Sequence, residues 1–397
     1  MNVVHIGWGD GMDGRVLVIG AGLGGLTLAH ALVRAGVDVR VYEADDGTGD
    51  RFQGYRIGLA PPGLEALRAA LPERLYALAE ATGGWLTGPG LLFDERLTEL
   101  SRDHEGPPQG ALATDRQVLR RILLGGLGGR VAYGRRLVDF AEDAGGVTAC
   151  FADGTESRGE VLVGADGGNS AVRRRLVPEV GLADADLCGA MGRTTLTERF
   201  LRLVPGRGTM VRGPGITLML GPMRFGREPS TAAAELAPGL DLPYRDDYVR
   251  WVLLVPPGHP AATAAEDARD LVLELIDGWH PDLLDLVRSS DMSAVGRSKV
   301  LDRPMPPWPV GRVTLLGDAA HLTLASGGNG ANTAMQDAVR LSARLAEAFE
   351  GERDLASALG EYQRDLLERG NAAVEVGKRA AKRFVPSNTA NRGEATL

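Results

Sequence analysis

One glycine-rich turn constrains the fold of this chain more than any other feature. Residues 15–19 (RVLVI) form a nearly continuous apolar run, which is the pattern of a strand buried on both faces, and GAGLGG follows it directly. After this turn, apolar residues recur at helical spacing, and VDVRVYE then alternates as a second strand that ends at Glu43. Residues 15–43 therefore predict a strand, a helix and a parallel strand, the unit from which doubly wound α/β folds are built.

The three glycines of this turn suit the binding of a dinucleotide. Gly20 permits the tight turn, Gly22 lets the backbone approach a pyrophosphate, and Gly25 lets helix and strand pack closely. The start of the helix offers free N–H groups and the positive end of its dipole to phosphates, and Glu43 would accept hydrogen bonds from ribose hydroxyls. We therefore interpret the segment as a dinucleotide-binding site, although the motif does not separate FAD from NAD.

Two later carboxylates follow further buried strands. Asp166 comes at the end of the apolar run in VLVGADGGNSAVRRRL, and Asp318 comes at the end of RVTLLGD. Both would lie at the carboxyl edge of the sheet, where open α/β folds bind their ligands. Each could also be only a turn or helix-cap residue, which is the commoner role of an aspartate before glycines or small residues.

The remaining patterns separate helical regions from a strand-rich one. Amphipathic segments, one of them interrupted by Pro72, predict helices before the middle of the chain and two long helices near its end. Between residues 181 and 296, strand-like runs alternate with Gly/Pro turns, which indicates a second, mainly antiparallel sheet. The predicted helices cover residues 62–81 (two short helices), 115–125, 265–278, 331–350 and 354–384, and a small antiparallel meander leads to VLVGA at 161–165.

Composition and charge narrow the possible functions. The 397 residues carry 44 basic and 52 acidic side chains without a long basic stripe, so we expect no nucleic-acid partner. Cys150 and Cys188 lie far apart and outside any C-x-x-C or Cys/His cluster, so we expect neither a disulfide framework nor a metal site. No run of roughly 18 apolar residues and no signal-peptide pattern occurs, so we expect a cytoplasmic protein without a membrane partner.

The glycine motif and the two aspartate segments, in this order, resemble the flavoprotein aromatic hydroxylases, which are single-component FAD monooxygenases with the para-hydroxybenzoate hydroxylase fold. The resemblance covers nearly all of residues 15–380. It implies that the first motif binds the ADP half of FAD, that the segment of Asp166 and Gly167 contributes to both FAD and NAD(P)H binding, and that Asp318 holds the ribityl chain. It also implies that Arg116 contacts the flavin's linker and pyrophosphate, with Arg51 as a further candidate.

The resemblance also gives a role to the glycine-rich run after Asp318. Gly328 and Gly330 would let the backbone pass close to the flavin ring, and the helix that starts near Ala331 would direct its N–H groups at the pyrimidine edge, where a reduced flavin carries negative charge. The expected cofactor-binding residues are Gly20, Gly22, Gly25, Glu43, Arg51, Arg116, Asp166, Gly167, Asp318, Gly328, Gly330, Ala331 and Asn332.

One loop departs from the family's pattern. Family members usually have a proline between the histidine and the glycines, whereas residues 322–326 here read LTLAS after His321. The fixed backbone geometry that a proline supplies is absent at this point, so the position of the substrate cannot be transferred from the family. We expect His321 to be a structural residue of the turn, and we assign no protein base, because the family's chemistry relies on the flavin as the oxidant.

The resemblance implies a discontinuous fold. The expected FAD-binding domain is doubly wound and Rossmann-type, it ends in the long helices, and a mainly antiparallel substrate domain is inserted into it. Residues 1–14 have no periodic pattern and are expected to be a disordered or artefactual extension, and the polar residues 386–397 a disordered tail. The FAD-binding domain is assigned residues 15–84, 103–180 and 297–385, and the substrate domain residues 85–102 and 181–296.

The activity that the resemblance implies is an FAD-dependent monooxygenation. NADPH or NADH would reduce the FAD, and O2 would form a flavin C4a-hydroperoxide that hydroxylates or epoxidises an aromatic or polycyclic small molecule, in the biosynthesis or inactivation of a specialised metabolite. The alternatives on the same fold are Baeyer–Villiger-type oxygenation, oxidation without oxygen transfer, and a flavin-binding protein that steers a non-redox cyclisation. Halogenases share much of the fold, but the chain has no Trp-x-Trp-x-Ile-Pro stretch. The protein is expected to be a monomer or a homodimer.

The substrate-contacting residues are harder to identify from the sequence. The pocket would lie between the strand-rich region and the flavin, and alternation along strands directs about half of any candidate set away from it. Because only 5% of residues are aromatic, we expect a bulky, partly apolar substrate held by aliphatic walls rather than a tightly bound anion. The candidates are Arg193, Thr195, Arg212, Met219 and Trp251.

Overall fold

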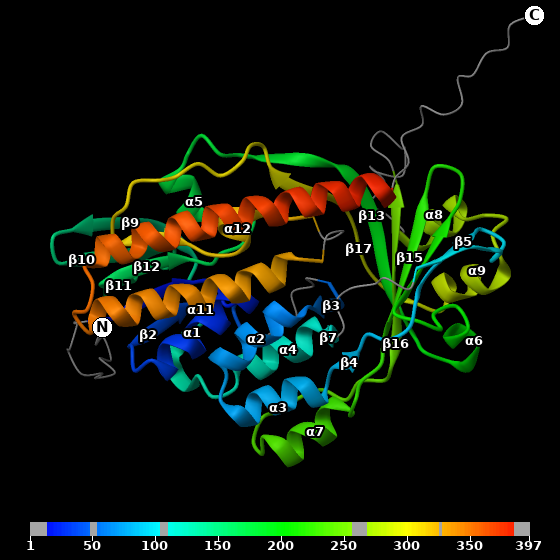
Figure 1. Ribbon diagram of the computed structural model, residues 1–397, viewed down its shortest axis with the longest axis horizontal. Coiled ribbons are helices and arrows are strands. Elements are labelled where there is room, and N and C mark those ends of the chain that lie inside the picture. Colours follow the sequence, from blue (N-terminus) through cyan, green and yellow to red (C-terminus); the bar gives the residue numbers. More distant parts are fainter. Residues whose placement is uncertain (1–13, 48–53, 104–109, 256–267, 325–327, 385–397) are drawn as a thin grey trace, which may run out of the picture.

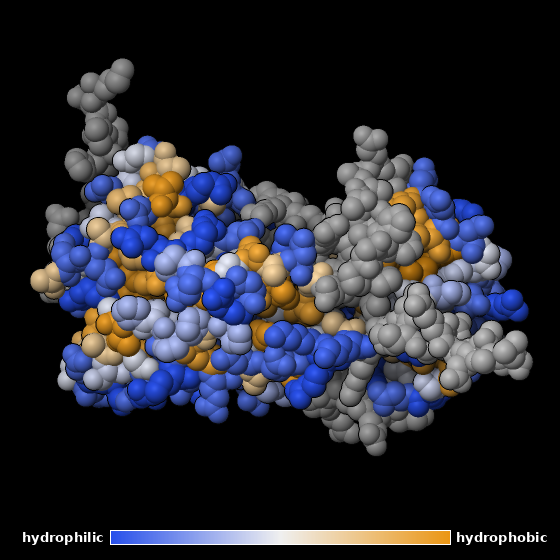
Figure 2. All heavy atoms as spheres, turned by 90° about the horizontal axis from the view of Figure 1, so that it is seen from above, coloured by the Kyte–Doolittle hydropathy of each residue, from blue (hydrophilic) through white to orange (hydrophobic). Residues whose placement is uncertain are grey.

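The computed structural model describes residues 14–47, 54–103, 110–255, 268–324 and 328–384. Figure 1 shows a larger body, built on a parallel sheet and crossed by two long helices, beside a smaller body built on a second sheet. On the face seen in Figure 2, the described residues of the larger body alternate between apolar patches and polar side chains, as is usual for a water-exposed surface. No helix within the described ranges is long and apolar enough to cross a membrane.

The larger body contains the predicted parallel sheet. Its five strands pair in parallel in the order β18-β12-β1-β2-β8, and Val16 of the first strand lies between Val39 and Val161. The central strands are fully buried, which explains their continuous apolar sequences. The strands are β1 (Val16–Ile19), β2 (Val39–Tyr42), β8 (Val131–Ala132), β12 (Val161–Gly164) and β18 (Val313–Leu315).

Helices and a small sheet surround these five strands. The first helix, α1, packs against α4 and α11, and α11 in turn packs against α2 and α12. The predicted meander is confirmed as the antiparallel sheet β11-β10-β9, which leads into β12. The helices are α1 (Leu23–Arg34), α2 (Pro61–Ala70), α3 (Glu73–Ala81), α4 (Arg116–Leu124), η1 (Gly128–Arg130), α5 (Ala171–Leu176), α10 (Asp318–His321), α11 (Gly330–Phe349) and α12 (Leu355–Phe384), and the strands are β9 (Leu137–Asp143), β10 (Gly146–Phe151) and β11 (Glu156–Gly159).

The smaller body contains the predicted, mainly antiparallel sheet. Its strands follow the order β17-β13-β16-β15-β14-β5-β6, and only the pairing of β14 with β5 is parallel. One face packs on short helices through a second apolar core that includes Trp251 and Leu283. The elements are β5 (Gly90–Asp94), β6 (Glu99–Asp103), β13 (Leu182–Thr195), α6 (Glu198–Leu201), β14 (Gly208–Arg212), β15 (Thr217–Met223), β16 (Tyr248–Val255), α8 (Ala268–Leu275), α9 (Pro281–Arg288) and β17 (Asp291–Leu301).

A third sheet, which the sequence patterns did not predict, joins the two bodies. It consists of β3 (Arg56–Leu59), β7 (Leu112–Asp115) and β4 (Gly84–Trp85) in antiparallel pairing. A small apolar cluster of Tyr55, Ala113, Met223 and Tyr248 connects it to the second sheet. Two elements extend beyond the predicted substrate domain of residues 181–296. Strand β17 continues to Leu301, and α7 (Pro229–Leu236) packs on α3 of the larger body.

Candidate active site

The glycine turn after β1 has the geometry that its motif predicts. Gly20 has a φ of +108°, and a Cβ there would lie 2.4 Å from the carbonyl oxygen of Ala165, so only glycine fits. A Cβ on Gly25 would lie 2.2 Å from the carbonyl oxygen of Gly20, which shows how closely helix and strand approach. A Cβ on Gly22 would meet nothing within 4 Å, and α1 begins there without a side-chain cap. The start of α1 is therefore open to a ligand.

Glu43 is tied to the same turn. Its Oε2 accepts a hydrogen bond of 2.8 Å from the backbone N–H of Ala21 and lies 3.8 Å from Nη2 of Arg120. Arg120 also donates from Nε to the carbonyl oxygen of Ala21, at 3.0 Å. Arg120 was not among the predicted residues, although it follows Arg116 by one helical turn on α4 and so shares a face with it. Glu43 and Arg120 together hold the turn in place.

Asp166 uses only part of its hydrogen-bonding capacity within the protein. Its Oδ2 accepts from the backbone N–H groups of Ala171 and Val172, at 2.7 and 3.3 Å, and so caps α5. Its Oδ1 is buried and has no hydrogen-bond partner among the described residues. Burial raises the pKa of this carboxyl above its ordinary value, although the hydrogen bonds from the backbone N–H groups of Ala171 and Val172 oppose this effect. The unpartnered oxygen is therefore available to a ligand.

Asp318 lies at the first position of α10, and the turn of Leu316 and Gly317 joins it to β18; Gly317 has a φ of +62°. Its carboxylate makes no hydrogen bond within the described part of the chain and faces the start of α11, since a Cβ on Gly330 would lie 3.6 Å from its Oδ1. Burial raises the pKa of Asp318, and the charges of His321 and Arg116 oppose this effect. The structure thus brings Asp318, Arg116 and the start of α11 together.

The start of α11 has no side-chain cap, and its first turn lies beside β3. The Asn332 side chain is already engaged: Oδ1 accepts from the backbone N–H of Ala60 at 2.8 Å, and Nδ2 donates to the carbonyl oxygens of Gly58 and Gly328 at 2.9 and 3.0 Å. Only the backbone of Asn332, like that of Ala331, can therefore face a ligand. Gly328 has a φ of +64° with open space beside it, and Arg51 lies outside the described residues.

His321 belongs to a buried charge network. Its Nε2 lies 2.6 Å from Oδ2 of Asp337, whose Oδ1 accepts two hydrogen bonds from Arg369 at 2.7 and 3.0 Å. Burial lowers the pKa of His321, but the Asp337 carboxylate and its hydrogen bond outweigh this effect, so that the pKa is raised above its ordinary value. Because Oδ2 of Asp337 also accepts from the backbone N–H of Gly317, the network holds the turn that carries Asp318. This geometry gives His321 a structural role.

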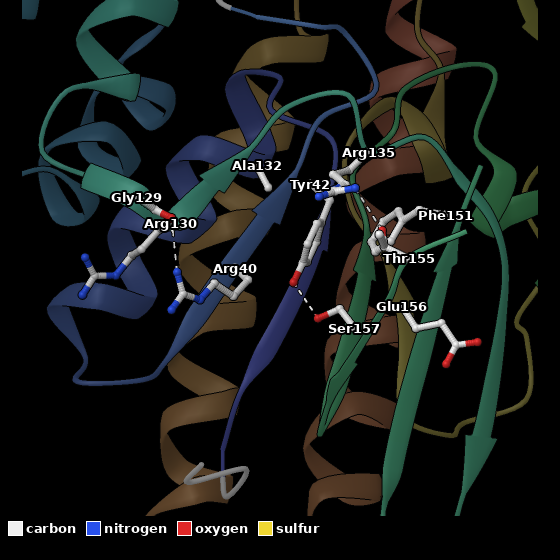
Figure 3. Close-up of a pocket in the computed structure, with 10 residues that line it drawn as sticks. All are labelled: Arg40, Tyr42, Gly129, Arg130, Ala132, Arg135, Phe151, Thr155, Glu156 and Ser157. Atoms are coloured by element: carbon white, nitrogen blue, oxygen red, sulfur yellow. Dashed lines mark hydrogen bonds between the residues drawn. The ribbon is translucent and has the colours of Figure 1, made fainter. Parts of the chain in front are cut away.

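A pocket of about 250 Å³ lies away from these groups, between the edge of the parallel sheet and the β9–β11 sheet. Figure 3 shows Tyr42 pointing toward Ser157, to which its hydroxyl is hydrogen-bonded at 2.6 Å. None of the expected cofactor-binding residues lines it. The lining residues are Arg40, Tyr42, Gly129, Arg130, Ala132, Arg135, Phe151, Thr155, Glu156 and Ser157.

The second sheet turns one face toward the larger body. In its register, Arg193 lies beside Arg250 and Arg250 beside Gly221, and a Cβ on Gly221 would lie 2.9 Å from Nη1 of Arg56 on β3. The candidates Arg193, Thr195, Arg212 and Met219 lie on this face by the alternation of their strands. Trp251 lies on the opposite face, fully buried in the second core, and so cannot contact a substrate.

Comparison with known proteins agrees with this geometry. A family model described as FAD binding domain matches residues 13–376. A dual O-methyltransferase/FAD-dependent monooxygenase, elcB of Phaeosphaeria nodorum, is 33% identical over 87% of this chain and 42% of its own length, and an FAD-dependent urate hydroxylase of Klebsiella pneumoniae is 31% identical over 89% and 86%. The crystal structure of a proposed FAD-containing monooxygenase from Photorhabdus luminescens superposes with a TM-score of 0.80 at 30% identity, covering 94% of this chain and 98% of that one.

The extent of these matches differs among the relatives. The chain spans less than half the length of the dual methyltransferase/monooxygenases, at 42% to 46%, but most of the length of the urate hydroxylase. The family match covers both bodies of the fold and every described residue of the candidate site. The chain belongs to the FAD-dependent aromatic hydroxylase and monooxygenase family.

Proposed function

We propose that the protein uses NADPH or NADH and O2 to hydroxylate or epoxidise an aromatic or polycyclic small molecule, with FAD as its cofactor. The observation that carries this proposal is the set of unsatisfied groups at one edge of the parallel sheet: the buried Oδ1 of Asp166, the carboxylate of Asp318, and the uncapped starts of α1 and α11. Acceptors for hydroxyls and donors for a pyrophosphate and a pyrimidine are what FAD requires.

Different residues at this edge would bind different parts of FAD. The N–H groups of α1 would bind the pyrophosphate, Glu43 and Arg120 would hold the turn beside the ribose, and Asp318 would accept hydrogen bonds from the ribityl hydroxyls. Arg116, on the helix that faces Asp318, would neutralise the phosphates. The backbone N–H groups of Gly330 and the following residues would stabilise negative charge on the ring without a basic side chain.

The reaction needs oxidising chemistry that the side chains do not supply. Bound FAD provides it by passing two electrons from NAD(P)H to O2. In a hydroxylation, one substrate C–H becomes C–OH, the second oxygen atom leaves as water, and NAD(P)H and one proton are consumed. The protein's own tasks are to position the substrate and to exclude water. We further propose that this activity serves a specialised-metabolite pathway in the cytoplasm.

The proposal is tested by anaerobic stopped-flow absorbance of the purified holoprotein. NADPH or NADH should bleach the flavin band faster in the presence of one member of a panel of polycyclic phenols, and readmission of 18O2 should then yield a product carrying one labelled atom. Bleaching of the flavin without a labelled product would mean that the substrate is oxidised without transfer of an oxygen atom. A bound flavin that neither coenzyme reduces would favour a flavoprotein that steers a non-redox cyclisation.

A further inference from the structure

Two arginines face one another between the two bodies of the protein. Arg56 is the first residue of β3, and Arg250 lies on β16 of the second sheet, opposite Gly221 of β15. A Cβ on Gly221 would lie 2.9 Å from Nη1 of Arg56 and 3.3 Å from Nη2 of Arg250. Both guanidinium groups therefore lie over the same glycine, where the missing side chain leaves them room.

Neither arginine has a carboxylate partner among the described residues. The Nε atoms of both are buried without a hydrogen bond. The carboxylates nearby are engaged elsewhere: Asp115 caps α4 with Oδ1 and accepts from the hydroxyl of Tyr248 with Oδ2, and Asp291 lies 3.4 Å from Arg193. Burial, followed by the charge of Arg250, lowers the pKa of Arg56 to about 9. Two like charges held together in this way are unfavourable unless an anion joins them.

The position of the pair is equally specific. Arg56 shares one face of β3 with Gly58, whose carbonyl oxygen is held by Asn332 in the first turn of α11. On the second sheet, the row next to Arg250 consists of Met191, Val252 and Met219, whose side chains are half-buried. The pair thus lies beside an apolar wall of the second sheet, and the strand that carries Arg56 also borders the start of α11 through the carbonyl oxygen of Gly58.

We propose that Arg56 and Arg250 bind an anionic oxygen of the substrate, so that the substrate is an acidic aromatic compound whose ring lies against Met191, Val252 and Met219. This inference rests on the proposed function and names its substrate class: an aromatic carboxylate or an ionised phenol or enol. Two adjacent guanidinium groups suit one negatively charged oxygen or a carboxylate. The inference departs from the expectation, based on the low aromatic content, that the substrate is not a bound anion.

A binding experiment compares charged and uncharged forms of one ring system. Perturbation of the flavin absorbance of the holoprotein, at a pH well below the pKa of Arg56, gives Kd for 1-hydroxy-2-naphthoate, for a fluorinated 2-naphthol that is ionised at that pH, and for the neutral 1-hydroxy-2-naphthamide. We expect the wild type to prefer the anions, and R56Q or R250Q to weaken the binding of the anions roughly tenfold or more while leaving the Kd of the amide unchanged. The two anions separate the carboxylate source of the charge from the phenolate source.

A second measurement needs no substrate. If the two arginines await an anion, R250Q removes a repulsion and should raise the thermal midpoint of the protein, whereas R102Q, which removes an exposed arginine paired with Glu99 on the edge strand β6, should not. The naphthoate should raise the midpoint of the wild type more than that of R250Q. A lower midpoint for R250Q, or equal weakening of acid and amide, would show that the pair is structural and overturn the inference.

These outcomes are separable from the proposed function. The FAD content of the purified protein and its reduction by NAD(P)H test that function and do not depend on the charge of the substrate. If both hold while acid and amide bind equally well, only the anionic substrate class is wrong.

Discussion

The two aspartates at the carboxyl edge of the parallel sheet differ in how far the protein itself satisfies them. One oxygen of Asp166 caps α5, which is the common role of an aspartate before a helix. The other oxygen has no partner among the described residues. Asp318 has no such partner within the described chain, and burial raises its pKa. The protein keeps a buried acceptor at a cost in stability, which a ligand can offset.

Replacement of Asp318 by alanine should release FAD without unfolding the protein. Loss of hydrogen bonds from ribityl hydroxyls to a charged acceptor should cost about 1.5–3 kcal/mol, or roughly ten- to a hundredfold in FAD affinity. The ratio of flavin to protein absorbance after gel filtration measures this, and D241A, at an exposed aspartate, is the control. D318A purified with full flavin content would disprove the assignment.

Replacement of His321 by glutamine should show whether its charge is structural. The pKa of His321 is raised in the folded protein, so its stabilising charge is complete below the unfolded value of 6.5 and is lost as pH rises through the folded value. The variant should therefore lose about 3 kcal/mol of unfolding free energy at pH 5.5 and less at pH 9, measured by urea titration. An equal loss at both pH values would mean that His321 is neutral in the folded state.

At the scale of elements, α12 supports the turn that carries Asp318. It contributes Arg369 to the buried network of His321 and Asp337, and the hydroxyl of Tyr362 donates to the carbonyl oxygen of Leu315 at 3.0 Å. The contact is close at Gly370, where a Cβ would lie 2.7 Å from Cδ2 of His321. The long C-terminal helix therefore supports the turn that carries Asp318, and with it the proposed cofactor site.

Two glycines of α12 provide a matched pair for testing this contact. G370A should lower the free energy of unfolding by about 1–3 kcal/mol, because the new methyl group collides with the His321 ring, and should reduce FAD retention. G360A, where the nearest atom is 3.7 Å away, should raise it by about 0.5–1 kcal/mol through helix propensity alone. Denaturant midpoints and flavin content measure both effects. Equal stability of the two variants would refute the close packing of α12 on α10.

At the scale of the whole molecule, side-chain hydrogen bonds join the two bodies beside the candidate site, among them those of Arg245 and Tyr248. The hydroxyl of Tyr248, on β16, donates to Oδ2 of Asp115 at 2.8 Å, and Oδ1 of that aspartate caps α4, the helix of Arg116. The seven-stranded sheet is thereby tied to a helix that faces the proposed flavin site. The position of the substrate wall relative to the cofactor depends on this junction.

Removal of the Tyr248 hydroxyl tests the junction. Y248F should lower the free energy of unfolding by about 1–3 kcal/mol, because Oδ2 of Asp115 is left buried without its donor, and should raise KM more than it lowers kcat. Y244F, which removes an exposed hydroxyl bonded to Asp246, should change neither stability nor KM. If Y248F behaved like Y244F, the hydrogen bond would not hold the two bodies in place.

Local sequence was sufficient for most of the parallel sheet and its helices. The apolar runs that became β1 and β12 and the three glycines of the first turn each follow from contacts between near neighbours, where periodicity and backbone freedom decide the structure. The break at Pro72 appeared as predicted, with the proline at the start of α3. The start of α11 was predicted to within one residue.

Tertiary structure decided the features that depend on residues far apart in the sequence. The joining sheet pairs short strands that have little pattern of their own, and the role of Arg120 follows from its contacts with Glu43 and Ala21, although its place one turn after Arg116 could have pointed to it. The arginine pair depends on Gly221, Arg56 and Arg250, which three separate strands bring together. The sequence by itself determined the sheet, its helices and the cofactor motif, because short-range sterics and periodicity encode them. Only the packing of the two bodies determined which charged groups are left without a partner.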